Sequence, residues 1–239
     1  MSDGPYLSIV IPAFNEEQRL GATLDRVLQW LDEWGGTAEI LVVDDGSSDG
    51  TAELVRSRGE IDARVRLLEY GSNRGKGYAV GLGVSEAMGE QILFSDADLS
   101  TPIEEYTRLA EALESSHIAI GSRALPDSRL DKRQPLYREL MGRSFNLLVQ
   151  ALVFPGIQDT QCGFKLFRAD AARETFGRRK IDGFAFDVEI LFIARKLAYQ
   201  VAEIPVIWIN DEASRVDPIR HSIQMFRDIV GIRRLHRDL

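Results

Sequence analysis

The sequence Ile92-Leu-Phe-Ser-Asp-Ala-Asp98 is an apolar strand pattern that ends in two aspartates one residue apart. In an extended strand the side chains of residues 96 and 98 lie on the same face but about 6–7 Å apart, so the two carboxylates converge on one cation only if the chain turns at Ala97. Such a pair suits Mg²⁺ or Mn²⁺, hard cations that bind through one or two carboxylates together with substrate phosphates. A solvated turn or a helix cap is the alternative for an isolated Asp-x-Asp triplet. The surrounding sequence decides between the two.

The chain around this stretch alternates short apolar runs with helical patterns. Strands are expected at residues 7–11, 39–43, 64–69, 92–96 and 117–120. Helices are expected at residues 17–34, 51–58, 77–88 and 102–115. Strands that alternate with helices of this length indicate an α/β fold, with a mostly parallel sheet flanked by helices on both faces.

Polar residues follow each of these five strands. They are Asn15 and Glu16, Asp44 and Asp45, Arg74 and Lys76, Asp96 and Asp98, and Arg123. In open sheets of this kind, ligands sit at the carboxyl ends of the strands. Turn chemistry explains one polar cluster, but five along the same sheet edge predict a binding cleft.

The second half of the chain is less regular. Helices are expected at residues 136–154 and 186–199, and strands at residues 161–167 and 201–209. Asp217-Pro218 resembles the start of a last, amphipathic helix. Its apolar stripe consists of Ile219, Ile223, Phe226 and Val230. Its recurring arginines are Arg220, Arg227 and Arg234. No linker or repeat separates the halves, so we expect one domain over residues 1–239.

Charge and composition argue against several classes of protein. The net charge of −8 comes from the first 70 residues, which hold 14 acidic and 6 basic residues, while the rest balances at 23 and 23. We therefore expect no nucleic-acid partner. The single cysteine, Cys162, cannot form an internal disulfide, and no apolar stretch approaches the roughly 20 residues that cross a bilayer. With no signal-peptide pattern at the start, a reducing cytoplasm is expected.

Two other kinds of site can be weighed against the cleft. The run Gly71-Ser-Asn-Arg-Gly75-Lys-Gly77 invites a dinucleotide-binding interpretation, but Val80 stands where the fingerprint requires a third glycine. Lys76 and Arg74 remain candidates to bind a diphosphate, with a solvated loop as the alternative. Cys162 is most simply a small buried residue, and none of the three histidines lies near a nucleophile-elbow pattern, which argues against a hydrolase triad.

Short motifs along the chain resemble those of family-2 glycosyltransferases of GT-A fold. In the first half they are Ser8-Ile-Val-Ile-Pro-Ala-Phe-Asn-Glu16, Val42-Val-Asp-Asp-Gly-Ser47, Gly75-Lys-Gly77, Asp96-Ala-Asp98 and Gly121-Ser-Arg123. In the second half they are Leu140-Met-Gly-Arg-Ser-Phe-Asn146, Asp159-Thr-Gln-Cys-Gly-Phe-Lys165 and Phe186-Asp-Val-Glu-Ile190. The second set is similar to polyprenyl-phosphate sugar synthases, above all those that use glucose and dolichyl phosphate. The resemblance implies a Rossmann-like domain in which residues 7–123 bind the nucleotide sugar and residues 124–239 face the acceptor and the membrane.

The resemblance also implies roles by position. The nucleotide base and ribose would meet Pro12, Phe14, Glu16, Val43 and Asp45. The diphosphate would meet Lys76, Asp96, Ala97 and Asp98, with Mg²⁺ or Mn²⁺ held by Asp96 and Asp98. The acceptor phosphate would meet Arg123, Arg138 and Arg215. Catalysis would rest on Asp98, Arg123 and Asp187, where Asp187 orients the sugar or acts as a base, unless it is a helix N-cap or a surface acid.

Two residues depart from the related patterns. Ser100 stands where mannosyl relatives carry a glutamine that binds the metal, which puts a third protein ligand in doubt. Leu99 stands where eukaryotic glucosyl relatives have a glycine, and the N-terminal membrane helix of those relatives is missing. The chemistry needs no strong base, because a lipid phosphate with a second pKa of about 6 is already nucleophilic at neutral pH. Direct displacement would invert the anomeric centre.

We therefore expect an inverting hexosyltransferase that moves glucose from UDP-glucose onto a polyprenyl or dolichyl phosphate. One alternative is a mannosyltransferase that uses GDP-mannose. Another is a nucleotide-sugar-binding or nucleotidyltransferase-like protein without a lipid acceptor, although residues 12–17, Pro-Ala-Phe-Asn-Glu-Glu, lack the glycine-rich basic loop of a nucleotidyltransferase.

Contact with a membrane is expected to be peripheral and at its cytoplasmic face. Either the last helix, with its arginines among lipid phosphates, or the helix at residues 136–154 would make it. For both helices the alternative is packing on their own domain. The sequence leaves the oligomeric state open.

Overall fold

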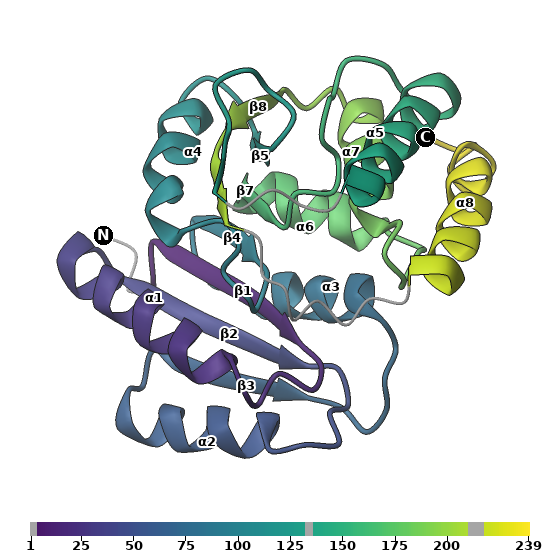
Figure 1. The fold of residues 1–239 in the computed structure, drawn as a ribbon. Coiled ribbons are helices and arrows are strands. Elements are labelled where there is room, and N and C mark those ends of the chain that lie inside the picture. The colour runs from purple at the N-terminus through teal and green to yellow at the C-terminus, as the bar shows by residue number, and fades with distance from the viewer. Residues whose placement is uncertain (1–3, 132–135, 210–217) are drawn as a thin grey trace.

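The computed structural model describes residues 4–131, 136–209 and 218–239, and its centre is a seven-stranded sheet (Figure 1). The strand order is β3-β2-β1-β4-β7-β5-β8. The strands are β1 (Leu7–Ala13), β2 (Ala38–Asp44), β3 (Val65–Glu69), β4 (Gln91–Ser95), β5 (Ile118–Ser122), β7 (Phe164–Arg168) and β8 (Val201–Pro205). The five strands expected in the first half, β1 to β5, all run in the same direction. β7 lies between β4 and β5 and is antiparallel to both, so β5 is parallel to β4. The mostly parallel sheet is confirmed.

Helices cover both faces of this sheet. One face packs against α1 (Leu20–Trp34), α2 (Thr51–Ile61) and α4 (Tyr106–Leu113). The other packs against α3 (Lys76–Glu86), α6 (Ala169–Gly177) and α7 (Phe186–Lys196), with α5 (Leu136–Leu152) and α8 (Pro218–Leu235) beside α7 (Figure 1). Strand side chains alternate between the two layers: Val10 packs with α3, while Ile9 and Ile11 pack with α1. Each such fully buried side chain stabilises the fold by about 1.5–3 kcal/mol.

The first strand does not stop at Pro12, as the sequence suggested, but continues to Ala13. Proline lacks an N–H, so in a sheet it is tolerated where one side of its strand has no partner. The pairing of β1 with β4 ends at Val10, opposite Phe94, whereas the pairing with β2 continues to the end of β1. Pro12 therefore lies in a part of β1 that pairs with β2 on one side and has no pairing with β4 on the other.

The second half differs from expectation in three elements. The run at residues 201–209 is two strands, because the chain passes after Val206 from the seven-stranded sheet to a separate two-stranded one. The second of these, β9 (Ile207–Ile209), pairs in parallel with β6 (Arg129–Asp131), a strand that the sequence analysis missed. It missed α6 as well, where the buried face consists mostly of small residues.

The expected helix at residues 102–115 consists of a 3₁₀ turn, η1 (Ile103–Glu105), followed by α4. The expected helix from residue 17 begins three residues later, at Leu20, because the residues before it form the loop after β1. In the described part of the chain, no helix combines the length and apolar character needed to cross a membrane.

Candidate active site

A cleft of about 880 Å³ opens at the carboxyl edge of the sheet, where the sequence placed its polar clusters. Its walls come from the ends of β1, β2 and β4, the turn before α3, the segment before α7, and α8. The residues predicted from sequence that line it are Pro12, Phe14, Asn15, Glu16, Asp45, Arg74, Lys76, Asp96, Ala97 and Asp98. The predicted cleft is therefore present, and most of the predicted donor-binding residues meet in it.

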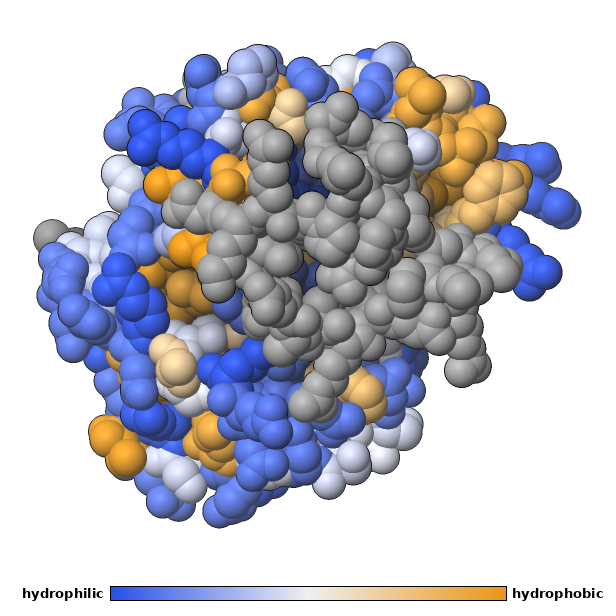
Figure 2. All heavy atoms as spheres, viewed as in Figure 1, coloured by the Kyte–Doolittle hydropathy of each residue, from blue (hydrophilic) through white to orange (hydrophobic). Residues whose placement is uncertain are grey.

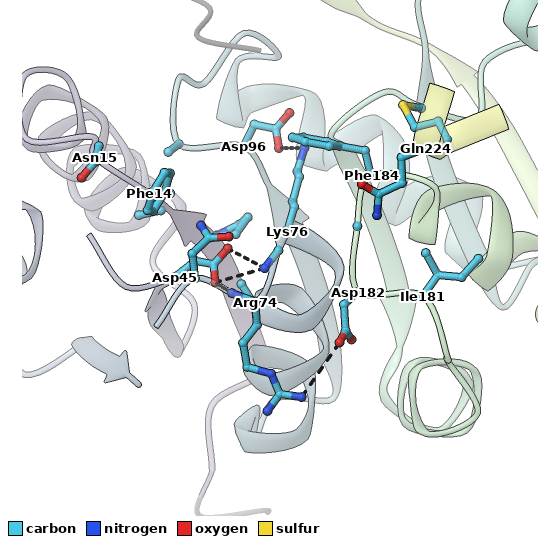
Figure 3. Close-up of a pocket in the computed structure, with 18 of the residues that line it drawn as sticks. Phe14, Asn15, Asp45, Arg74, Lys76, Asp96, Ile181, Asp182, Phe184 and Gln224 are labelled. Carbon is cyan, nitrogen blue, oxygen red and sulfur yellow. Dashed lines mark hydrogen bonds and ion pairs between the residues drawn. The ribbon is translucent and has the colours of Figure 1, made fainter. Parts of the chain in front are cut away.

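The loop after β1 is fixed to the loop after β2. Asn15 has a φ of 57°, in the left-handed region that Asn tolerates better than most residues. Its side-chain oxygen accepts the N–H of Ser48 at 2.8 Å, and its own N–H donates to the hydroxyl of Ser47 at 2.8 Å. This geometry leaves Phe14 on the cleft wall with 45% of its surface exposed (Figure 3). A large apolar ring held this way is available to pack against a ligand.

Asp45 organises the glycine-rich turn before α3. Its carboxylate accepts the N–H of Arg74 at 2.6 Å, the N–H of Gly75 at 2.9 Å and the hydroxyl of Tyr70 at 2.8 Å (Figure 3). Burial, together with the hydrogen bond to Asp45, raises the pKa of Tyr70, which stays protonated as a donor. Asp45 thus lies in the cleft, as predicted, but much of its hydrogen-bonding capacity already holds the turn.

The glycines of this turn serve close packing. The carbonyl of Asp182 accepts the N–H groups of Gly77 at 2.7 Å and Tyr78 at 3.2 Å, which are among the first free donors of α3. A Cβ on Gly75 would lie 2.6 Å from that carbonyl oxygen, and a Cβ on Gly77 would lie 2.6 Å from Phe186 Cβ. The segment before α7 therefore occupies the position that a phosphate takes in a glycine-rich nucleotide loop.

The side chain of Lys76 crosses the cleft to Asp96. Its Nζ lies 2.6 Å from Asp96 Oδ1, as Figure 3 shows. Burial alone would lower the pKa of Lys76, but the charges of Asp96 and Asp187 outweigh it, so the pKa is raised and the ammonium persists at neutral pH. The solvated-loop alternative for Lys76 is wrong, because the side chain points into the cleft.

Asp96 and Asp98 lie on a turn after β4, as the convergence argument required. Leu99 has a φ of 48°, and its N–H donates to the carbonyl of Asp96 at 3.2 Å. Burial and the nearby charge of Asp96 raise the pKa of Asp98, which also lies 4.0 Å from Arg19. Asp98 Oδ1 accepts the N–H of Ser100 at 2.9 Å.

These two carboxylates offer hard oxygen ligands on one side of the cleft. Gly163 makes room for the first of them, because a Cβ there would lie 1.9 Å from Asp96 Oδ2. Among the described residues, no cluster of three or more His, Cys, Asp or Glu side chains could hold a metal ion. Two carboxylates would therefore need further ligands from the substrate and from water, which is the usual arrangement for Mg²⁺.

Arg123 lies after β5 and is held by Asp159. Its Nε and Nη2 donate to the two carboxylate oxygens at 2.7 and 2.9 Å, and its guanidinium carbon is 5.6 Å from the centre of the Trp208 ring. Burial would raise the pKa of Asp159, but the charge of Arg123 outweighs it and lowers that pKa to about 2. Arg123 does not line the cleft described above. The side chain of Arg138 and all of Arg215 lie outside the described part of the chain.

Two further predicted residues have buried side chains. Val43 is fully buried in the core, which leaves only its main chain available to a ligand. Asp187 lies in the first turn of α7, after the N-cap position that Ala185 occupies, and only 3% of it is exposed. Both simple alternatives for Asp187, a helix N-cap and a surface acid, are therefore wrong. Its carboxylate is 2.5 Å from the buried Nζ of Lys165.

One wall of the cleft consists of residues that were not predicted from the sequence. The segment before α7 and one side of α8 line it through Lys180, Ile181, Asp182, Gly183, Phe184, Gln224, Met225, Asp228 and Leu235. Figure 3 shows Phe184 and Gln224 across the cleft from Phe14 and Asn15. The available signal was the Asp-Gly pair at residues 182–183 before an apolar helix, which marks a turn but names no partner.

Sequence comparisons agree with this architecture. The model of the family described as glycosyl transferase family 2 matches residues 8–176. The dolichyl-phosphate beta-glucosyltransferase of Dictyostelium discoideum is 40% identical over 97% of this chain and 75% of its own length. The human protein of the same name is 37% identical over 95% of this chain and 74% of its own length.

A solved structure with the same fold is glucosyl-3-phosphoglycerate synthase of Mycobacterium tuberculosis, in complex with Mn²⁺, uridine-diphosphate-glucose and phosphoglyceric acid. It superposes with a TM-score of 0.68 at 19% identity, over 96% of this chain and 78% of that one. The cleft at the carboxyl edge, the family match and the close relatives lead to one assignment. The chain belongs to glycosyl transferase family 2 and has the GT-A fold of that family.

Proposed function

We propose that the protein is an inverting glucosyltransferase that moves glucose from UDP-glucose onto the phosphate of a dolichol or another polyprenol. The observation that carries the proposal is the name dolichyl-phosphate beta-glucosyltransferase, shared by relatives that match at least 95% of this chain. The polar cleft supports it, because it offers carboxylates and an ammonium to a nucleoside diphosphate. We also propose that residues 1–239 form one domain, since β7 and β8 of the second half complete the sheet of the first.

In this proposal the nucleotide lies between the loop after β1 and the turn before α3. Pro12 and Phe14 pack against the base, and Glu16 and Asp45 offer acceptors to the base and ribose. Glu16 is already oriented by the guanidinium of Arg19. Val43 contributes through its main chain, because its side chain belongs to the core. The diphosphate then lies over Lys76, Asp96, Ala97 and Asp98.

A divalent cation fits beside this diphosphate. Asp96 and Asp98 would hold Mg²⁺ or Mn²⁺ with hard oxygen ligands, and the synthase from Mycobacterium tuberculosis, crystallised with Mn²⁺, supports this choice of metal. When bound, the cation offsets the negative charge that develops on the leaving diphosphate. The protein adds the ammonium of Lys76 on the same side of the cleft, within 2.6 Å of Asp96. Ser100 supports this site through its main chain, by its N–H to Asp98.

Arg123 would hold the attacking phosphate, together with Arg138 and Arg215. Two nitrogens of its guanidinium are engaged by Asp159, so the second terminal nitrogen remains to donate to the acceptor. The positive charge of Arg123 and the guanidinium donors of Arg138 and Arg215 would suit a phosphate and offset its repulsion from the diphosphate. The phosphate oxygen itself attacks the anomeric carbon, so no general base is needed.

The acceptor implies contact with a lipid surface. Apolar side chains gather over α5 and α8, bordered by hydrophilic residues on the outer side (Figure 2). Leu147 on α5 and Phe226 and Val230 on α8 are exposed by 70%, 49% and 55%. Ile229 and Ile232 of α8 are buried against the domain, so this helix both packs on the protein and presents an apolar face.

We propose that this face docks on the cytoplasmic surface of a membrane, with Arg227 and Arg234 near lipid phosphates. The double variant Phe226→Ser/Val230→Ser should then sediment with anionic liposomes at least about tenfold more weakly, because each apolar group inserted into lipid contributes on the order of 1 kcal/mol. Ile61→Ser is the matched control, since Ile61 is 81% exposed on α2, on the other side of the sheet. Equal sedimentation of the double variant and the wild type would refute the docking face.

The activity itself is tested with a panel of nucleotide sugars and a short-chain polyprenyl phosphate, with Mg²⁺, with Mn²⁺ and with EDTA. We expect a β-linked glucosyl lipid from UDP-glucose and none with EDTA. Faster transfer from GDP-mannose than from UDP-glucose would show that GDP-mannose is the donor and that this part of the proposal is wrong. UDP-glucose turnover that does not depend on the lipid phosphate would refute the acceptor.

A further inference from the structure

A complete ion pair lies buried beneath the cleft. Lys165 on β7 is 0% exposed, and its Nζ donates to Asp187 Oδ1 at 2.5 Å and to the carbonyl of Cys162 at 2.6 Å. Removing two charges from water is costly, and apolar residues of similar volume often serve stability equally well. A pair of this kind at this place therefore calls for a role beyond holding the core together.

The carbonyl that Lys165 binds belongs to a short loop, residues 159–163, between two parts of the proposed site. At one end of the loop, the carboxylate of Asp159 accepts hydrogen bonds from the guanidinium and from the main-chain N–H of Arg123. At the other end, the Gly163 carbonyl accepts the N–H of Asp96 at 3.0 Å, and the missing Cβ of Gly163 leaves room for the Asp96 carboxylate. The loop thus contacts the arginine proposed for the acceptor and the aspartate proposed for the metal.

The ion pair fixes this loop to α7. Lys165 is the only described side chain that binds the Cys162 carbonyl, and Asp187 anchors the ammonium from the first turn of the helix. An anion is favourable at that position, because the N-terminus of a helix carries a partial positive charge. Through this pair the loop is tied to β7 and α7, and the N–H of Asp159, which donates to Glu203 at 2.8 Å, ties its first residue to β8.

We propose that Lys165 and Asp187 are positioning residues, which hold loop 159–163 so that Arg123 and Asp96 keep the spacing needed for an acceptor phosphate to reach the donor. Asp187 acts through Lys165 and takes no proton from the substrate. The inference rests on the proposed function, because it assigns the two ends of the loop to the acceptor and the donor. The position of Asp187 supports it, since its buried carboxylate does not line the cleft.

The decisive variant is Lys165→Met/Asp187→Leu. It removes both charges together and leaves no unpaired ion in the core, so its Tm should lie near that of the wild type, while Lys165→Met and Asp187→Asn should each lower the Tm. The loop loses its tether in all three. We expect kcat/KM of the double variant to fall by about 10- to 100-fold, as for losses of supporting residues around a metal site. The KM for the acceptor should rise more than the KM for UDP-glucose.

A matched control is the pair of Arg66 and Glu39, whose atoms lie 2.6 Å apart and whose carboxylate is buried at the opposite edge of the sheet. Arg66→Met should lower the Tm without changing kcat or either KM. The pH profile of kcat in Asp187→Asn should keep its shape. A profile that loses its acidic limb would overturn the inference and make Asp187 a base, and so would a double variant with wild-type kcat and KM values.

Failure of this inference can be told apart from failure of the proposed function. Transfer by the wild type to polyprenyl phosphate tests the function alone. Binding of Mn²⁺ in the presence of UDP, followed by electron paramagnetic resonance, reports on Asp96 without any acceptor. We expect the double variant to bind Mn²⁺ about 10- to 100-fold more weakly, and unchanged affinity would overturn the positioning role even in an enzyme that uses another acceptor.

Discussion

Gly163→Ala tests how closely Asp96, the aspartate proposed to bind the metal, is fitted to its surroundings. A Cβ at this position would lie 1.9 Å from Asp96 Oδ2, 2.3 Å from its Cγ and 2.7 Å from Oδ1. Because contacts this short cannot persist, the Asp96 carboxylate must rotate away, and its pair with Lys76 at 2.6 Å is lost. The substitution therefore moves a proposed metal ligand without removing it.

The cost to the fold should be small. The carboxylate that must move is about one-third exposed, and an exposed ion pair contributes up to about 1 kcal/mol. The replacement of glycine by alanine offsets this by about 0.4–1 kcal/mol, because the unfolded chain loses freedom. The free energy of unfolding should thus change by less than about 1 kcal/mol, while kcat/KM falls by at least about 10- to 100-fold.

The assay measures kcat/KM for UDP-glucose as a function of Mn²⁺ concentration, alongside urea unfolding. We expect half-saturation at a higher Mn²⁺ concentration. Gly177→Ala is the matched control, because a Cβ there meets nothing within 4 Å, and it should keep wild-type kinetics. If Gly163→Ala keeps the wild-type kcat/KM and metal dependence, the fit between Gly163 and Asp96 has no part in catalysis.

Three further predictions concern single residues. Asp98→Ala should abolish metal-dependent transfer while the fold persists by circular dichroism, and wild-type turnover in this variant would exclude Asp98 as a ligand. Burial raises the pKa of the Cys162 thiol to about 11, so it should resist iodoacetamide at pH 8 in the folded protein and react once the protein is unfolded in urea. Asp159 has a pKa of about 2 in the fold, below its ordinary value. Its ionised carboxylate therefore contributes on the order of 2 kcal/mol to the free energy of unfolding above about pH 4, and this contribution is lost as the pH falls toward 2. The stability difference between the wild type and Asp159→Asn should therefore narrow over that range, and a constant difference in urea midpoints would contradict it.

Much of the fold could be predicted because its signals are local. Short continuous apolar runs, such as that of Ile9 to Ile11, alternate with helical patterns, and this alternation implies a parallel sheet. The direction of β7 is not local, since nothing in Phe164–Arg168 distinguishes an antiparallel strand from a parallel one. The small residues of α6 likewise give a weak apolar pattern, which is why that helix was missed.

The residues of the candidate site also divide into those that local signals predict and those that depend on contacts between separate elements. Residues that directly follow parallel strands, such as Asp45 and Asp96, could be placed at one edge from strand order alone. The contacts that hold the surrounding segments join separate elements: Asp182 meets Gly77 over a hundred residues away, and Lys165 on β7 meets Asp187 on α7. Such pairs carry no spacing signal in a single sequence, so the wall before α7 could not be predicted. The roles of Arg138 and Arg215 stay predictions.

The attachment of the segment before α7 decides which of the neighbouring positions can accept another side chain. The bonds that join it to α3 run from the carbonyl of Asp182 to main-chain N–H groups, so they do not depend on which side chain residue 182 carries. Exchange of the side chain at residue 182 would therefore leave the segment attached to α3. Gly75 and Gly77, which pack against this segment, cannot be replaced in the same way, because any Cβ there would push the segment away.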